Sequence, residues 1–175
     1  MRGIAPVATA AAIAVMASVG TASPAHAEDF GVALNGTYRV VSDGEWAKKG
    51  AAPGGAEVFF DQQTVIETWT VSSSCVSPIE CSGEVKSDRG WTGTLRLDDF
   101  WYIDHDIPNW LPCPNGTFAP GHQKFIVEGI DPTRNEHING IRDFLGGRNV
   151  TKTASGACGR NQPLVIEMPV TMTKI

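Results

Sequence analysis

The sequence predicts an all-β domain, a small antiparallel up-and-down barrel held by two disulfides, with a β-sandwich as the alternative. Three observations indicate this class. Short segments of alternating apolar and polar residues follow one another, no segment shows a sustained helical period, and Gly and Pro clusters separate the segments. Because no long crossover is evident between them, sequential hairpins favour the barrel over the sandwich.

The first 27 residues have the form of a secretory signal peptide. Arg2 supplies a positive charge, an apolar stretch rich in Ala, Val and Ile follows, and Ala25-His26-Ala27 is an A-x-A cleavage motif. We expect cleavage after Ala27, which leaves residues 28–175 as a single secreted domain. The alternative is a retained membrane anchor, but Thr, Ser and Gly interrupt the apolar run. No later stretch is long and apolar enough to span a bilayer.

The stretch from Thr64 to Leu97 predicts a three-stranded meander. Its strands are expected at Thr64–Ser74, Ser82–Lys86 and Trp91–Leu97. In the third segment apolar residues and Gly alternate with Thr and Arg, which is typical of a sheet with one dry and one wet face. The other expected strands are Thr37–Ser42, Ala56–Phe60, Phe100–His105, Gln123–Ile130, Asn135–Phe144, Arg148–Thr153 and Leu164–Thr173.

Two segments are predicted to interrupt these strands. Ile107–Gly121 contains four prolines, so we expect an irregular loop rather than a regular element. Gly146-Gly147 is expected to divide the segments 135–144 and 148–153.

All four cysteines follow residue 27, and their even number in an exported chain predicts two disulfides. Four cysteines allow three pairings. We favour Cys75–Cys81 with Cys113–Cys158, because Cys75 and Cys81 flank one turn. Zinc binding is the alternative, but C-x5-C is not a usual zinc spacing, so no metal site and no cofactor are predicted.

The chain is acidic, with a formal net charge of −5. Removal of Arg2 with the leader would make it one unit more acidic. An acidic chain without a Lys/Arg stripe argues against nucleic acids and anionic lipid surfaces as partners.

The aromatic residues are dense between residues 46 and 110. On the strand that begins at Phe100, alternate aromatic side chains face opposite sides, so a small barrel cannot enclose them all. One set is therefore a candidate lining for an apolar cavity, with a lid on the Pro-rich loop. The alternative is that the aromatic side chains fill the barrel and cap its ends. The candidate ligand-binding residues are Trp69, Trp91, Trp101, Tyr102 and Trp110.

Acidic side chains flank the same strand as Asp98-Asp99 and Asp104-His105-Asp106. Such groups can hold Ca²⁺ or act as general acid and base, and the alternative is a solvated strand end. The histidine spacing marks no zinc site, and no G-x-S-x-G motif is present. No catalytic residue is assigned.

Several motifs combine turns, tryptophans and cysteines. They are Trp69–Cys75, Gly90–Gly93, Pro108–Gly116, Pro120–Gln123 and Ser155–Asn161. Together they resemble a group of small exported proteins of mycobacteria and their relatives, over most of the chain after the leader. The resemblance implies secretion and an all-β fold. Because the group has no assigned activity, it carries no catalytic residue to this chain.

These observations favour a secreted β-barrel binding module for an apolar small molecule or a cell-envelope partner. The first alternative is a structural or interaction protein of the envelope without a pocket. The second, less favoured, is a hydrolase built around Asp104, His105 and Asp106.

Overall fold

The computed structural model describes residues 30–50, 58–138 and 140–175. The expected leader and its cleavage site lie outside the described residues. Among the described residues, no helix has the length and apolar character needed to cross a membrane.

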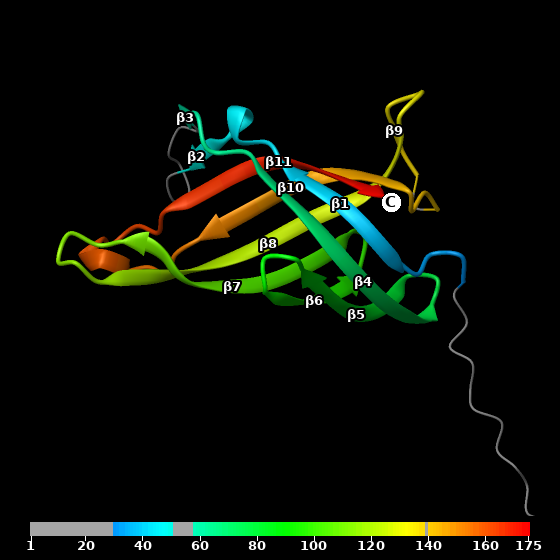
Figure 1. Ribbon diagram of the computed structural model, residues 1–175, viewed down its shortest axis with the longest axis horizontal. Helices are drawn as coiled ribbons and strands as arrows, with labels where there is room; N and C mark the ends of the chain where they lie inside the picture. Colours follow the sequence, from blue (N-terminus) through cyan, green and yellow to red (C-terminus); the bar gives the residue numbers. More distant parts are fainter. Residues whose placement is uncertain (1–29, 51–57, 139) are drawn as a thin grey trace, which may run out of the picture.

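Eight strands form a closed antiparallel barrel in which each barrel strand pairs with the next barrel strand along the chain, and the last pairs with the first (Figure 1). This confirms the predicted all-β up-and-down barrel. The barrel strands are β1 (Gly36–Ser42), β4 (Val65–Ser77), β5 (Glu80–Ser87), β6 (Thr92–Leu97), β7 (Trp101–Pro112), β8 (Phe118–Asp131), β10 (Phe144–Lys152) and β11 (Val165–Lys174).

Three short strands lie outside the barrel wall. β2 (Lys48–Gly50) pairs with β11 and carries β3 (Val58–Phe59), while β9 (Glu136–His137) pairs with β8. The short 3-10 turns η1 (Gly44–Trp46) and η2 (Ala157–Gly159) complete the described secondary structure.

Side chains fill the barrel interior. The ring centroids of Trp69 and Phe125 lie 4.7 Å apart, edge to face, at the centre of the core. An eight-stranded barrel is just wide enough for its inward side chains to close the interior, and alternation along each strand supplies them. The largest fully buried side chains are Trp69, Tyr38, Phe125, Leu34, Leu95, Ile103, Leu145 and Met172.

The expected irregular loop at Ile107–Gly121 is wrong. β7 continues to Pro112, β8 begins at Phe118, and the hairpin extends beyond the barrel (Figure 1). Its pairing breaks between Ile107 and Leu111, which places Pro108 at an irregularity. β6 pairs with β7 only as far as Asp104, so the outer edge of the hairpin needs no N–H donor. Prolines are tolerated at such edges and bulges.

The glycine pair does not divide strands, which corrects a second expectation. Gly146 and Gly147 lie inside β10, paired with both β8 and β11. A Cβ atom on Gly147 would clash with the carbonyl oxygen of Ile126, so the glycine permits close strand approach. Of the expected strand 135–144, only β9 forms, and Phe144 begins β10. Asn135 has a φ of 54°, which places it in a turn.

Both predicted disulfides are confirmed. Cys75–Cys81 joins directly opposed residues of β4 and β5 at one end of the barrel. Cys113–Cys158 fastens the tip of the β7–β8 hairpin to η2 near the other end. No cysteine is free. The bonds thus hold the two ends of the barrel separately.

Burial raises the pKa of Tyr38 to about 12, with Asp143 adding to the rise and Arg142 opposing it. A tyrosine in an unfolded chain titrates near 10. Between about pH 10 and 12 the folded barrel therefore keeps a proton that the unfolded chain releases. We expect the contribution of Tyr38 to the free energy of unfolding to be complete below pH 10. It should fall by up to about 2 kcal/mol as the pH approaches 12. Urea unfolding of wild type and Tyr38→Phe across this range should show the loss in wild type only; an equal decline in both would contradict this assignment.

Candidate functional site

The five candidate aromatic residues do not form one site. Trp69 is enclosed in the core, Trp91 is partly buried beside it, and Trp101 lies at one end of the barrel. Tyr102 faces outward, where the guanidinium carbon of Arg96 lies 4.2 Å from the ring centroid. The structure therefore brings Trp69 and Trp91 together and leaves the other candidates apart from them.

Trp110 does not lie over the end of the barrel that Trp101 occupies. It belongs to the extended β7–β8 hairpin and packs over Gly121, where an added Cβ would lie 2.7 Å from the indole. Trp110 also lines a shallow recess with Phe60 and Leu164 near β2. Trp110 therefore does not cover the end of the barrel where Trp101 lies, as the expected lid role would require.

The buried carboxylate of Glu67 accepts hydrogen bonds from two tryptophans. The indole Nε1 of Trp69 donates to Oε2 at 2.7 Å, and that of Trp91 donates to Oε1 at 3.2 Å. The Nε of Arg89 lies 3.4 Å from Oε1. Glu67 interrupts the apolar alternation of β4, and these contacts explain why. Both indole N–H groups therefore have a buried partner in Glu67.

The residues Asp104, His105 and Asp106 point apart. His105 faces the interior, where its ring stacks on Trp91 at 3.9 Å and its Nε2 lies 2.6 Å from Oε1 of Gln123. The two aspartates face outward, as their alternation on β7 requires. His105 therefore lies on the opposite side of the barrel wall from the two aspartates.

On the outer face, His122 bridges the two aspartates. Its Nε2 lies 3.0 Å from Asp104 and its Nδ1 lies 2.8 Å from Asp106. Lys124 adds a contact of 3.4 Å to Asp104. Among the described residues, no cluster of three or more His, Cys, Asp or Glu side chains is arranged to hold a metal ion.

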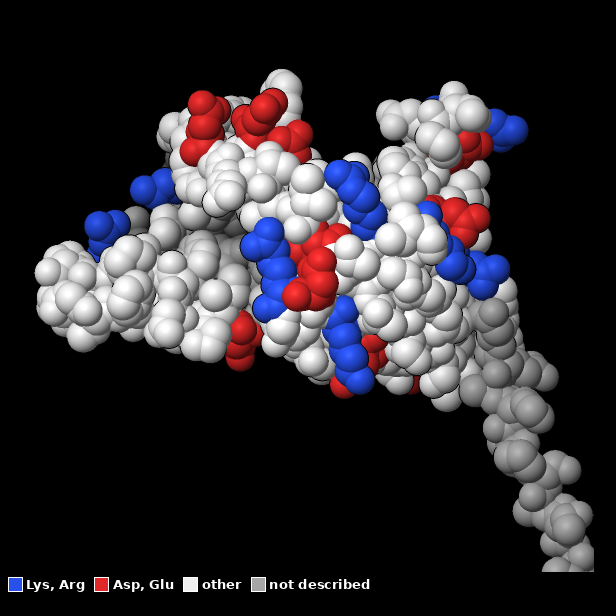
Figure 2. Space-filling view, viewed as in Figure 1, with Lys and Arg blue, Asp and Glu red and all other residues white. Residues whose placement is uncertain are grey.

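Charged side chains of both signs are interleaved over the face shown in Figure 2.

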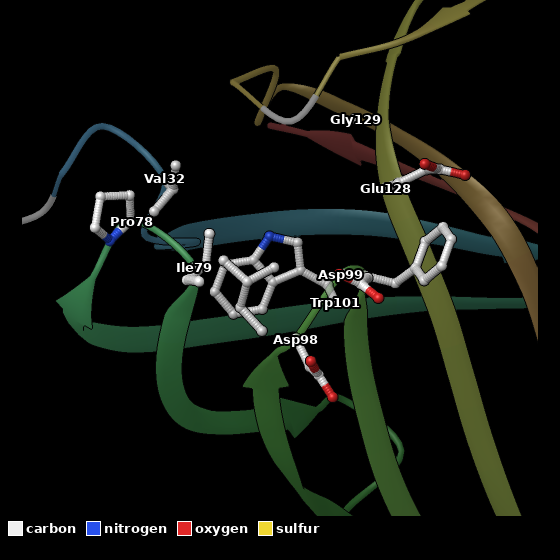
Figure 3. Close-up of a pocket in the computed structure, with 10 residues that line it drawn as sticks. Val32, Pro78, Ile79, Asp98, Asp99, Trp101, Glu128 and Gly129 are labelled. Atoms are coloured by element: carbon white, nitrogen blue, oxygen red, sulfur yellow. The ribbon is translucent and has the colours of Figure 1, made fainter.

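A cavity of about 160 Å³ lies at the Cys75–Cys81 end of the barrel. The segment before β1, the β4–β5 turn, the β6–β7 turn and the end of β8 surround it (Figure 3). Its apolar lining consists of Val32, Pro78, Ile79, Leu97, Phe100 and Trp101. Its acidic lining consists of Asp98, Asp99 and Glu128.

Two of the three carboxylates in the cavity lining have cationic or imidazole neighbours. Arg96 Nη1 lies 3.4 Å from Asp98, and His137 Nδ1 lies 2.8 Å from Glu128. Asp99 has no hydrogen-bond or ion-pair partner among the described residues. The cavity therefore combines apolar walls with one carboxylate that is free to bind.

The sequence signals only part of this site. It marks Trp101 and Asp98-Asp99, but for different roles. Val32, Ile79 and Glu128 come from three distant segments, and only closure of the barrel places them together. Of these three, only Ile79 could have been noticed from the sequence. It is a large apolar residue in a turn between two cysteines, where it cannot pack into the core.

No protein-family model and no curated protein matches the chain. Among solved structures, it is similar to the sensor domain of PknI from M. tuberculosis in its monomer form. The two share 16% sequence identity with a TM-score of 0.53, over 82% of this chain and 88% of that chain. The likeness shows a shared fold.

Proposed function

We propose that this chain is an extracytoplasmic binding module that takes a small, largely apolar molecule into the cavity at its Cys75–Cys81 end. The observation that carries the proposal is the position of Trp101, a large aromatic side chain that forms part of an open cavity although the rest of the interior is filled. Apolar walls with a few polar groups are the usual composition of small-molecule sites.

The size of the cavity limits the ligand. At about 160 Å³ it is smaller than the sites that hold drug-sized molecules, which start at roughly 300 Å³. A single ring with a short substituent is a suitable size. The two disulfides support an oxidising compartment outside the cytoplasm, and the fold likeness to a sensor domain is compatible with a binding role.

A role as an interaction protein of the envelope is the second candidate, and one observation favours it. Trp46 and Phe59 are each 62% exposed and meet edge to face, with ring centroids 6.5 Å apart. Exposed aromatic pairs are common at protein interfaces. This pair lies near β2 and β3, at the end of the barrel away from the cavity, so the two candidates can be tested separately.

Benzyl alcohol is a suitable neutral probe for the cavity, and NMR titration measures its affinity. Ile79 in the β4–β5 turn lines the cavity, whereas Val76 near the end of β4 does not, and both residues are 77% exposed. Ile79→Ser should weaken benzyl alcohol binding about fivefold through lost apolar contact, while Val76→Ser should leave it unchanged. Equal effects of the two substitutions, or no binding to wild type, would contradict the proposed function.

A further inference from the structure

We propose that the cavity selects a small organic amine that also carries a hydroxyl or another hydrogen-bond acceptor beside its apolar group. This inference rests on the proposed function and specifies its ligand class. Two independent features of the cavity carry it: the charge of its lining and a tryptophan N–H group that has no partner.

The charged residues that line the cavity are all acidic. Asp98, Asp99 and Glu128 line it, and no Lys or Arg does. Arg96 and His137 contact Asp98 and Glu128 from outside the lining, which leaves Asp99 as the carboxylate without a partner. A cationic group is attracted to such a rim, and an anionic group is repelled.

Trp101 supplies the second feature. The residue is only 4% exposed, yet no described residue accepts a hydrogen bond from its indole Nε1. The fully enclosed side-chain atoms without partners are His105 Nδ1 and Asn149 Oδ1, so the Trp101 nitrogen retains some contact with open space. Because Trp101 lines the cavity, we assign that space to the cavity.

The two features lie on different sides of the cavity. Figure 3 shows the nitrogen of Trp101 on the edge of the ring that is turned away from the carboxylates of Asp98 and Asp99. Ile79 and Val32 lie beside the ring on the apolar side. A ligand that uses both features therefore needs its ammonium group and its acceptor separated by a short linker, with an apolar part between the walls. An unpaired indole N–H favours such an acceptor, because a buried donor without a partner is costly.

Four probes that share a phenyl ring separate these features. Phenylethanolamine carries both an ammonium and a hydroxyl group, styrene glycol replaces the ammonium by a hydroxyl, mandelate replaces it by a carboxylate, and phenethylamine lacks the hydroxyl. Wild-type protein should bind phenylethanolamine about threefold or more tightly than styrene glycol, and mandelate weakest. Phenethylamine should bind about threefold more weakly than phenylethanolamine.

Asp99→Asn should reduce phenylethanolamine affinity about threefold and remove the preference for phenylethanolamine over styrene glycol. Asp61→Asn is the matched control, because it removes the same charge at the opposite end of the barrel, where Asp61 follows β3. Raising the salt from about 0.05 to about 0.5 M should weaken only the amines. Trp101→Phe should abolish the preference for phenylethanolamine over phenethylamine, and the wild-type comparison stands if this variant folds poorly.

The outcomes distinguish this inference from the function on which it rests. If styrene glycol binds at the cavity as tightly as phenylethanolamine, the amine selectivity is wrong while the binding module stands. If phenethylamine equals phenylethanolamine, the role of the Trp101 N–H is wrong. If none of the four probes binds, both the inference and the proposed function are wrong.

Discussion

Trp69→Ala is expected to lower the free energy of unfolding by about 3–5 kcal/mol, a loss at the upper end for a single substitution in a protein core. Trp69 is fully buried and packs edge to face against both Trp91 and Phe125. Truncation leaves a cavity at the centre of a filled barrel and removes a hydrogen-bond donor from the buried carboxylate of Glu67. Urea denaturation followed by circular dichroism measures the loss.

Trp46→Ala provides the control for Trp69→Ala. It removes the same side chain from a position that is 62% exposed, so we expect a loss of no more than about 1 kcal/mol. Losses of similar size for the two variants would mean that the core is not centred on Trp69.

Removing the Cys113–Cys158 bond by paired serine substitutions should destabilise the barrel by about 4 kcal/mol in the chain-entropy model. The two cysteines are 45 residues apart in the sequence, so their bond closes a long loop in the unfolded chain. Cys75 and Cys81 are only 6 residues apart, and the same model gives about 2 kcal/mol for their bond. Thermal or urea unfolding of the two paired variants tests the difference.

The opposite order of the two losses would contradict this prediction. A greater loss from the Cys75–Cys81 pair would show that the short bond stabilises the folded β4–β5 turn more than it restricts the unfolded chain. Because that turn lines the cavity through Pro78 and Ile79, such a result would also mean that the short bond helps to hold the cavity open.

The sequence predicts the barrel because alternation is a local property. Trp69 and Val71 alternate with polar neighbours on β4, and Gly93 and Leu95 do so on β6. The local pattern therefore predicts which face of each strand is buried. The same reasoning explains the correct disulfides, since Cys75 and Cys81 flank one turn. These features need no knowledge of distant segments.

The errors come from residues whose effect depends on a neighbouring strand. The sequence predicts a break at Pro108, but this proline lies where pairing with β8 is already interrupted. It also predicts a strand end at Gly147, but this glycine admits the backbone of Ile126. Glu67 interrupts an apolar face because two tryptophan N–H groups need its carboxylate. The local sequence shows neither where the carbonyl group of a neighbouring strand lies nor which indole N–H group lacks a hydrogen-bond acceptor.

The sequence predicts some of the residues of the candidate site but not where in the fold they meet. The sequence marks Trp101 and Asp99, but residue type alone groups Tyr102 and Trp110 with Trp101. Alternation places Tyr102 on the outer wall, and the length of the β7–β8 hairpin carries Trp110 away from the cavity. The site requires barrel closure, which brings Val32 and Glu128 to the same end.

Mapping amide chemical shifts during a benzyl alcohol titration tests most directly whether the cavity is a binding site. We expect the largest changes to cluster at Val32, Ile79, Leu97, Trp101 and Gly129, around one end of the barrel. Saturable changes clustered instead near Trp46, Phe59 and Trp110, or no saturable change at any amide, would contradict a ligand site in the cavity.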